Sequence, residues 1–346
     1  MSPESRGAGL GRRSAQFGAW GLGLAGVLAL TAPALAPNQP GDQFPDRAYA
    51  PPMQVHVRDA QGFRAPFVHQ QQLEDRLMRQ YRDATAVPLS WFSHGHLVSI
   101  DPTGGPLLLL GADALGRDIF SRLLYGARLS LGVTCLGTIG ALLLGACIGG
   151  LAGTLGGRTD GALMLVADFI LVLPGVYLVL VLRAMLPLVL PTAEVFWLMA
   201  LLFAVAGWPH VARGVRAIVA AERARDYAEA ARAAGAGSFR LLGHLLPATR
   251  GFLAVETVLL VPALLAAEAT ISYLGLGFPE PAPSWGAMLQ AAANVRVVGE
   301  APWLLAPAVA LFMVVLCVQL AGGVRASSTA LLREARPARA SARVTT

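Results

Sequence analysis

Three acidic residues lie inside long apolar runs of this chain: Asp168, Glu256 and Glu268. A carboxyl group is costly to bury in a membrane, so such a residue usually lines a solute pathway or pairs with a charge on a neighbouring helix. We expect either a counter-charge for a solute that carries an amino group, or ion pairs with residues such as Arg128 and Arg183.

The chain lacks residues that several kinds of catalysis need. All 27 basic residues are arginine, whereas a phosphate-binding P-loop and a pyridoxal-phosphate site both require lysine. The three cysteines lie in apolar runs without metal-ligand spacing, and no GxSxG or HExxH motif marks a membrane hydrolase. We therefore expect no catalytic residue, no metal site and no cofactor in this chain.

The composition indicates a membrane protein. Hydrophobic residues make up 55% of the chain and charged residues 14%, against roughly 25% charged residues in soluble domains. Six stretches have, or approach, the about 20 apolar residues that cross a bilayer. They are Phe17–Ala36, Ala127–Leu151, Ala162–Leu182, Val195–Val211, Leu253–Ile271 and Trp303–Leu320. The predicted fold is an all-α polytopic membrane protein with six transmembrane helices.

The first stretch has two interpretations. Arg12 and Arg13 precede it, and Ala34–Ala36 ends it with the small-residue pattern of a cleaved secretory signal. Pro37 is a poor residue to follow a cleavage site, and the apolar run is long for a signal. We therefore favour a retained transmembrane helix.

The placement of arginine predicts the orientation. With six spans, the arginine-rich segments 1–16, 212–251 and 323–346 fall on one side, and the long segment 37–124, with nearly balanced charge, falls on the other. The positive-inside rule then places both termini in the cytoplasm. Residues 125–322 would form the transmembrane core.

Arg117, Arg122 and Arg128 lie on the outer side in this arrangement and oppose the rule. Asp113 and Asp118 precede the first two by four residues, the spacing of ion pairs on a helix. We expect these pairs to offset the unfavourable charge.

The long segment after the first stretch predicts a small folded element of mixed structure. Val55–Val57 alternates as a short strand does. Gln70–Asp83 is polar, with Leu73, Leu77 and Tyr81 at helical spacing.

The long basic loop 212–251 carries the strongest functional signal. Tyr227, Ala230, Ala231 and Ala234 fall on one helical face of small residues. An amphipathic helix on the membrane surface is the alternative, but alanine gives a weak lipid affinity. We expect this helix to bind a protein partner.

The residues of this loop resemble a known motif. Glu229-Ala230-Ala231, then Gly235, then Leu245-Leu246-Pro247 resembles the EAA motif of binding-protein-dependent ABC importer permeases. Gly235 would also cap the first helical run, and Pro247 would stop the second.

Two further stretches narrow the resemblance. Gly111–Leu131 and Glu268–Leu289 are similar to segments of the dipeptide, oligopeptide and nickel permease subfamily. The resemblance covers residues 105–322, and the single long outer segment is similar to the C-type partner of a permease pair. Residues 37–105 depart from the subfamily pattern.

The resemblance implies a type I ABC importer core in a bacterial inner membrane. The implied partners are a homologous permease subunit, two cytoplasmic ABC ATPase subunits that bind ATP, an extracytoplasmic substrate-binding protein and membrane lipid, with no nucleic acid. The implied ATPase-coupling residues are Glu229, Ala230, Ala231, Gly235, Leu246 and Pro247. Glu229 would either meet a basic group on the ATPase or cap its own helix.

Two expectations concern the outer side and the class of transporter. Ser284, Trp285 and Gly286 could form part of an outer gate, or Trp285 could be an interfacial anchor. A secondary transporter is the alternative function, but it would predict internal repeats, and none is evident. The solute is left open among dipeptides, longer peptides and nickel chelates.

Overall fold

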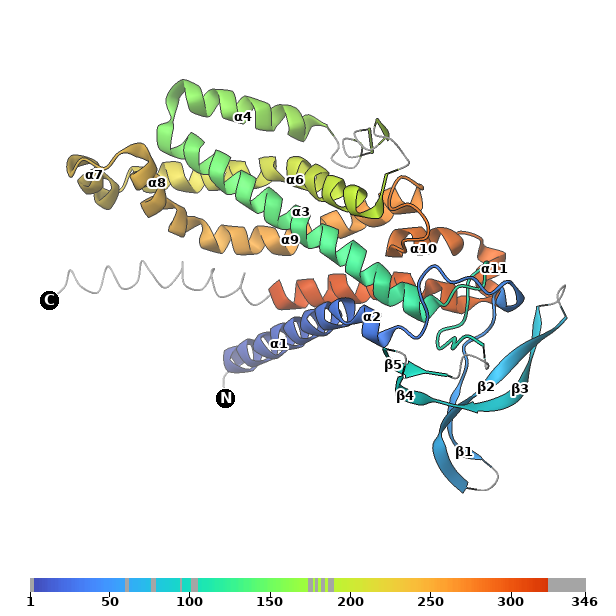
Figure 1. Ribbon diagram of the computed structural model, residues 1–346. Coiled ribbons are helices and arrows are strands. Elements are labelled where there is room, and N and C mark those ends of the chain that lie inside the picture. Colours follow the sequence, from blue (N-terminus) through green and yellow to red (C-terminus); the bar gives the residue numbers. More distant parts are fainter. Residues whose placement is uncertain are drawn as a thin grey trace.

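The structure, a computed structural model, describes residues 3–59, 62–75, 79–93, 95–100, 105–173, 177, 180–181, 184–185 and 190–322. Long helices run alongside one another, and the strands gather at one end of this bundle (Figure 1). The short helices α7 (Asp226–Ala233) and α8 (Ser238–Leu245) lie at the opposite end, where α1 (Pro3–Leu30) begins.

Four helical segments of the described chain are long and apolar enough to cross a membrane. They are α3 (Ile119–Leu155), α6 (Thr192–Arg223), the path Ser238–Tyr273 through α8, η3 (Leu246–Thr249) and α9 (Arg250–Tyr273), and Pro302–Gly322. Each contains one of the six predicted stretches. A bilayer needs only about 20 residues, so α3, with 37 residues, is long enough to extend beyond it.

The other two predicted stretches lie on helices outside these four segments. The first lies mostly on α1, and the third begins on α4 (Gly157–Val172). The rest of the third stretch, including Arg183, falls largely outside the described residues.

Glycine allows α3 and α6 to pack closely. A Cβ atom added at Gly149 would lie 2.3 Å from the backbone oxygen of Ala212, and one at Gly145 would lie 2.4 Å from Cβ of Val211. Small residues that let backbones approach are typical of helix contacts in membranes, where the hydrophobic effect gives little drive for association.

The segment before α3 forms an outer element of strands and short helices. The helices are α2 (Ala32–Leu35) and η1 (Pro45–Arg47). β1 (Val55–Asp59), β2 (Gly62–Asp75) and β3 (Gln80–Pro88) form an antiparallel sheet in that order. β4 (Ser90–Ser93) pairs with β5 (His96–Ser99).

The strand predicted at Val55–Val57 is confirmed, but the helix suggested by Gln70–Asp83 is wrong. β2 runs to Asp75 and β3 begins at Gln80. Leu73 and Tyr81 are direct cross-strand partners. The hairpin therefore pairs two side chains that a helix would place on one face about two turns apart, and the spacing could not separate the two structures.

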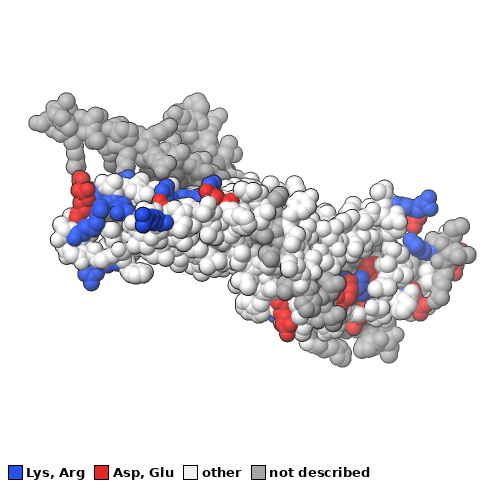
Figure 2. All heavy atoms as spheres, turned by 90° about the horizontal axis from the view of Figure 1, so that it is seen from above, with Lys and Arg blue, Asp and Glu red and all other residues white. Residues whose placement is uncertain are grey.

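The chain after α9 returns to the bundle through α10 (Trp285–Ala291), α11 (Val295–Glu300) and η4 (Pro302–Leu305). On the face that Figure 2 shows, charged residues gather toward the two ends of the molecule, with an uncharged surface between them. This distribution fits an apolar middle that lies in lipid.

Candidate functional site: the loop 212–251 and the buried polar cluster

The turn between α6 and α7 is held by side chains of the loop itself. Glu222 accepts a hydrogen bond from the Tyr227 hydroxyl at 2.8 Å and forms an ion pair with Arg225 at 3.0 Å. Arg232 donates to the backbone oxygen of Arg223 at 2.5 Å. Two of the loop arginines thus make specific contacts within the chain, which the sequence did not suggest.

The two helix ends in the loop differ. Gly235 has φ of 82° and its N–H donates to the Arg232 oxygen at 2.9 Å, which confirms the predicted glycine cap. α8 ends at Leu245, two residues before Pro247, which confirms the predicted stop of the second helical run. Pro247 lies in the first turn of a 3-10 helix, η3, that leads directly into α9, because proline needs no backbone N–H donor there.

α7 has an inner and an outer side. Ala228 is completely buried and packs with Leu241 and Leu245 of α8. Glu229 and Ala230 are exposed, and the Glu229 carboxylate has no partner among the described residues. The side chain of the N-cap residue Arg225 makes no capping hydrogen bond, and Glu229 lies in the first turn of α7, where an acid favours the positive end of the helix dipole.

The predicted alanine face is divided between these two sides. Tyr227, Ala230 and Ala234 are exposed, whereas Ala231 is half-buried against the core. Sequence reasoning missed Ala228, although its spacing of three residues from Ala231 is that of one helical face.

α8 attaches the loop to the long helices. Leu241 and Leu245 pack in one cluster with Val215 and Val219 of α6. A Cβ atom at Gly150 of α3 would lie 2.8 Å from a Leu242 methyl group. A displacement of α8 would therefore act on α3 and α6, and on α9 through η3.

The far part of α9 carries a buried carboxyl group. Glu268 is fully buried, and its Oε1 accepts a hydrogen bond from the Ser272 hydroxyl at 2.7 Å. The hydroxyls of Ser130 on α3 and Ser284 before α10 lie close to the carboxyl group, whereas its Oε2 has no hydrogen-bond partner among the described residues. Burial of a carboxyl group requires such polar partners, so Glu268 joins three elements and does not face an open pathway.

The residues after Ser284 are fixed against the same helices. The Trp285 backbone N–H donates to Ser130 Oγ at 3.2 Å, and its indole N–H donates to the Leu123 oxygen at 3.0 Å. A Cβ atom at Gly286 would lie 2.3 Å from the Ala269 oxygen. Trp285 is only 3% exposed, so the interfacial-anchor alternative is wrong.

The other two intramembrane acids lie elsewhere. Asp168 of α4 forms an ion pair with Arg213 of α6 at 2.5 Å, so helix pairing is the correct interpretation, with a different arginine from those expected. Glu256 of α9 lies within electrostatic reach of His210. The structure does not bring Asp168, Glu256 and Glu268 together as one site.

The outer arginines are partly neutralised, as expected, but one pairing is wrong. Arg117 pairs with Asp113 at 2.7 Å and with Glu280 at 2.6 Å. The charged groups within 4 Å of Arg122 are Asp113 and Glu280, at 3.9 and 3.8 Å, and not Asp118.

Asp118 instead caps the first turn of α3. It accepts hydrogen bonds from Phe120 and Ser121 and from the Asn38 amide. Burial raises the pKa of Asp118, and these hydrogen bonds oppose the rise. Asp and Ser at the N-cap are common in helices, so this role was readable from the sequence, whereas the contact with Asn38 was not.

Comparison with known proteins gives the family. Residues 145–328 match the model described as "Binding-protein-dependent transport system inner membrane component". The oligopeptide transport system permease protein OppC of Bacillus subtilis is 36% identical over 198 residues, 57% of this chain and 63% of that protein. The dipeptide permease DppC of the same species is 38% identical over 179 residues, 51% of this chain and 54% of that protein.

A third relative matches over a longer range. The di/tripeptide transport system permease protein DppC of Pseudomonas aeruginosa is 34% identical over 246 residues, 70% of this chain and 75% of that protein. The two Bacillus proteins are matched over less than two thirds of their length. Neither the family nor these relatives support the secondary-transporter alternative. With a family match over more than half of its length, the chain belongs to the inner-membrane components of binding-protein-dependent transport systems.

Proposed function

We propose that this chain is the permease subunit of an ATP-driven importer for peptides or similar small solutes. It would form half of the pathway, with a homologous permease subunit, two cytoplasmic ATPase subunits and an extracytoplasmic substrate-binding protein. The printed names of the relatives support the peptide class. ATP would be bound by the ATPase subunits and not by this chain.

The observation that carries the proposal is the exposed side of α7. Glu229 and Ala230 are exposed at one end of the bundle, and the Glu229 carboxylate lacks a partner within the described chain. Small side chains allow a helix to sit deep in a groove of another protein. The coupling residues Glu229, Ala230, Ala231, Gly235, Leu246 and Pro247 would transmit ATPase closure through this contact.

A continuous helical path supports a mechanism for transmission. α8, η3 and α9 connect the loop to Glu268 and then to Ser284, Trp285 and Gly286. Rigid-body displacement of packed helices is a common form of coupling. A shift at α7 would reach the Glu268 cluster and move the Trp285 turn, which we assign to the outer gate.

The topology is part of the same proposal. Six transmembrane helices, both termini in the cytoplasm and residues 37–124 outside agree with the arginine distribution. The beginning of α1 and the loop helices lie at the same end of the bundle, and the strands lie at the other (Figure 1). The boundaries 1–16, 17–36, 125–322 and 323–346 follow from this assignment.

The test is co-purification of an ATPase with the tagged chain from native membranes. Ala230→Arg places a long charged side chain on the exposed side of α7 and should reduce the captured ATPase at least tenfold. Ala221→Arg adds the same charge at an exposed position of α6 and is the matched control. Capture of no ATPase by the wild type, or equal loss in both variants, would contradict the proposal.

A further inference from the structure

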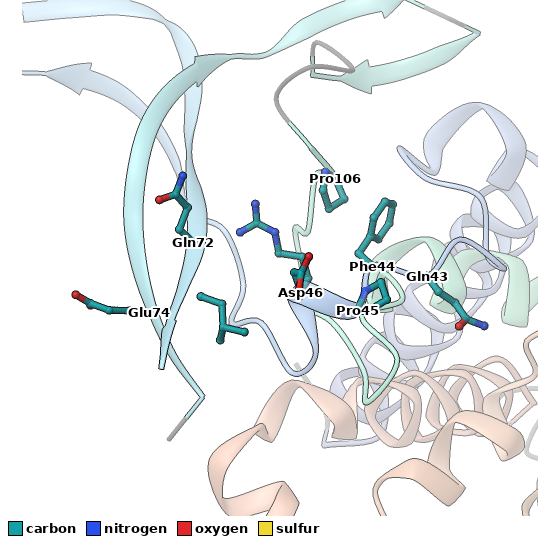
Figure 3. Close-up of a pocket in the computed structure, with 9 residues that line it drawn as sticks. Gln43, Phe44, Pro45, Asp46, Gln72, Glu74 and Pro106 are labelled. Atoms are coloured by element: carbon teal, nitrogen blue, oxygen red, sulfur yellow. The ribbon is translucent and has the colours of Figure 1, made fainter. Parts of the chain in front are cut away.

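A pocket of about 690 Å³ lies in the outer element, where η1 faces β2. Figure 3 shows Phe44 and Asp46 across the pocket from Gln72 on the strand, with Pro106 above them. The volume is in the range of sites for small molecules, about 300–1,000 Å³. Its lining combines apolar side chains, such as Phe44 and Leu73, with five polar or charged ones.

Two buried hydrogen-bond donors, one on Arg47 of the pocket wall and one on Gln70 behind it, lack acceptors. Arg47, which lines the pocket, donates through Nη2 to Gln70 Oε1 at 3.3 Å. Arg47 Nη1 and Gln70 Nε2 are both buried and have no partner among the described residues. Gln70 as a whole is only 6% exposed. An unpaired buried donor costs about 1–3 kcal/mol, so the Arg47 guanidinium at the pocket wall would gain from an acceptor that the described chain does not supply.

Gly105 leaves space beside this pair. Its φ is +81°, a conformation that side chains disfavour. A Cβ atom there would lie 3.2 Å from Gln70 Oε1 and 3.7 Å from Arg47 Nη2. No side-chain atom of residue 105 therefore crowds the Arg47–Gln70 pair.

The charges around the pocket favour an anionic group beside Arg47. Arg47 forms no ion pair within 4 Å with any acid in the described part of the chain. Glu74 points away from Asp46 in Figure 3 and pairs with Arg82 at 3.6 Å. Asp46 lines the pocket next to Arg47, which disfavours a solute with two negative charges and suits one that also carries an ammonium group.

We propose that this pocket binds the carboxylate of a small solute, with Arg47 as the donor and Gln70 as the residue that positions it. A guanidinium matches the two oxygens of a carboxylate, and the hydrogen bond to Gln70 Oε1 holds the Arg47 side chain at the pocket wall. The identification of the solute as a short peptide rests on the proposed function; the preference for a carboxylate does not. The pocket would retain peptides at the outer side of the membrane.

The test is calorimetric titration of the purified full chain in lipid nanodiscs with dialanine and with its C-terminal amide. The amide lacks the carboxylate and should bind at least tenfold more weakly. Arg47→Gln and Gln70→Leu should weaken the binding of dialanine to a similar degree. Arg58→Gln removes an arginine of β1 that does not line the pocket and should leave binding unchanged.

Several results would overturn the site. They are equal binding of dialanine and its amide, equal effects of the Arg47 and Arg58 substitutions, and no binding of dialanine by the wild type. If the binding protein bound the wild-type chain and dialanine did not, the pocket would be assigned to a carboxylate of that protein. This result would also overturn a solute site. Co-purification of the ATPase with Arg47→Gln shows that the variant folds, and separates failure of this site from failure of the importer proposal.

Discussion

The two ends of α9 are built in opposite ways. At the α8 end, the exposed side of α7 carries Glu229 without a partner in the described chain, together with Tyr227, Ala230 and Ala234. At the other end, Glu268 is fully buried and surrounded by hydroxyl groups from α3 and from the segment before α10. A surface left without partners is suited to another protein, whereas hydrogen bonds to one buried carboxyl group fix the elements of its own chain, even though Glu268 Oε2 has no hydrogen-bond partner among the described residues.

This contrast predicts where substitutions act. Changes at the Glu268 end should alter the folded state itself, because the groups there are buried and hydrogen-bond to one another. Changes on the exposed side of α7 should alter association with the ATPase and leave the melting temperature of the isolated chain nearly unchanged.

The largest effect is expected for Glu268→Ala. The substitution leaves a cavity and removes the acceptor of the Ser272 hydroxyl, so the free energy of unfolding should fall by about 3 kcal/mol. Glu268→Gln keeps an acceptor oxygen of similar size and should lose less than half as much. Thermal denaturation in detergent measures both, and equal melting temperatures of wild type and Glu268→Ala would contradict the buried network.

Gly286→Ala comes next. Its methyl group would lie 2.3 Å from the backbone oxygen of Ala269, and such overpacking costs about 2 kcal/mol. Gly235→Ala at the other end meets no atom within 4 Å but has φ of +82°, so it should cost only about 1 kcal/mol. A larger fall in melting temperature for Gly235→Ala than for Gly286→Ala would reverse the comparison.

A smaller effect is expected for the pair of Asp168 and Arg213. Their side chains are 45% and 55% exposed, and ion pairs of this exposure contribute about 0–1 kcal/mol in water. Asp168→Asn should therefore lower the melting temperature only slightly. If transport in reconstituted vesicles nevertheless stopped, Asp168 would have the pathway role that this pairing argues against.

The smallest effect is a difference in how stability depends on pH between Asp118, at the start of α3, and Asp160, which follows the end of α3. Burial raises the pKa of Asp118, so its contribution to stability should rise as the pH falls through that pKa and level off below the unfolded value. Hydrogen bonding to Arg216 lowers the pKa of Asp160, so its contribution is present above the unfolded value and is lost as the pH falls through the lowered pKa.

The check is the melting temperature of Asp118→Asn and of Asp160→Asn, each relative to the wild type, between pH 3 and 7. The two differences should change with pH in opposite directions. Parallel curves would show that the two carboxyl groups do not lie in different environments.

The sequence by itself determined the class of the protein and the place of its loop. Long apolar runs, the glycine after α7 and the small residues of that helix depend on local chemistry, because hydrophobic length and backbone conformation need no distant partner. The order of the motifs also gave the family, which the comparison confirmed.

Only the tertiary structure decided which partners these residues meet. It paired Asp168 with Arg213, buried Trp285 against Leu123 and Gly126, and formed a hairpin where a helix was expected. The pocket beside Arg47 likewise depends on η1, β2 and Gly105, which are far apart in the chain. Long-range contacts of this kind follow from packing between elements, and a pattern of local spacing cannot distinguish between them.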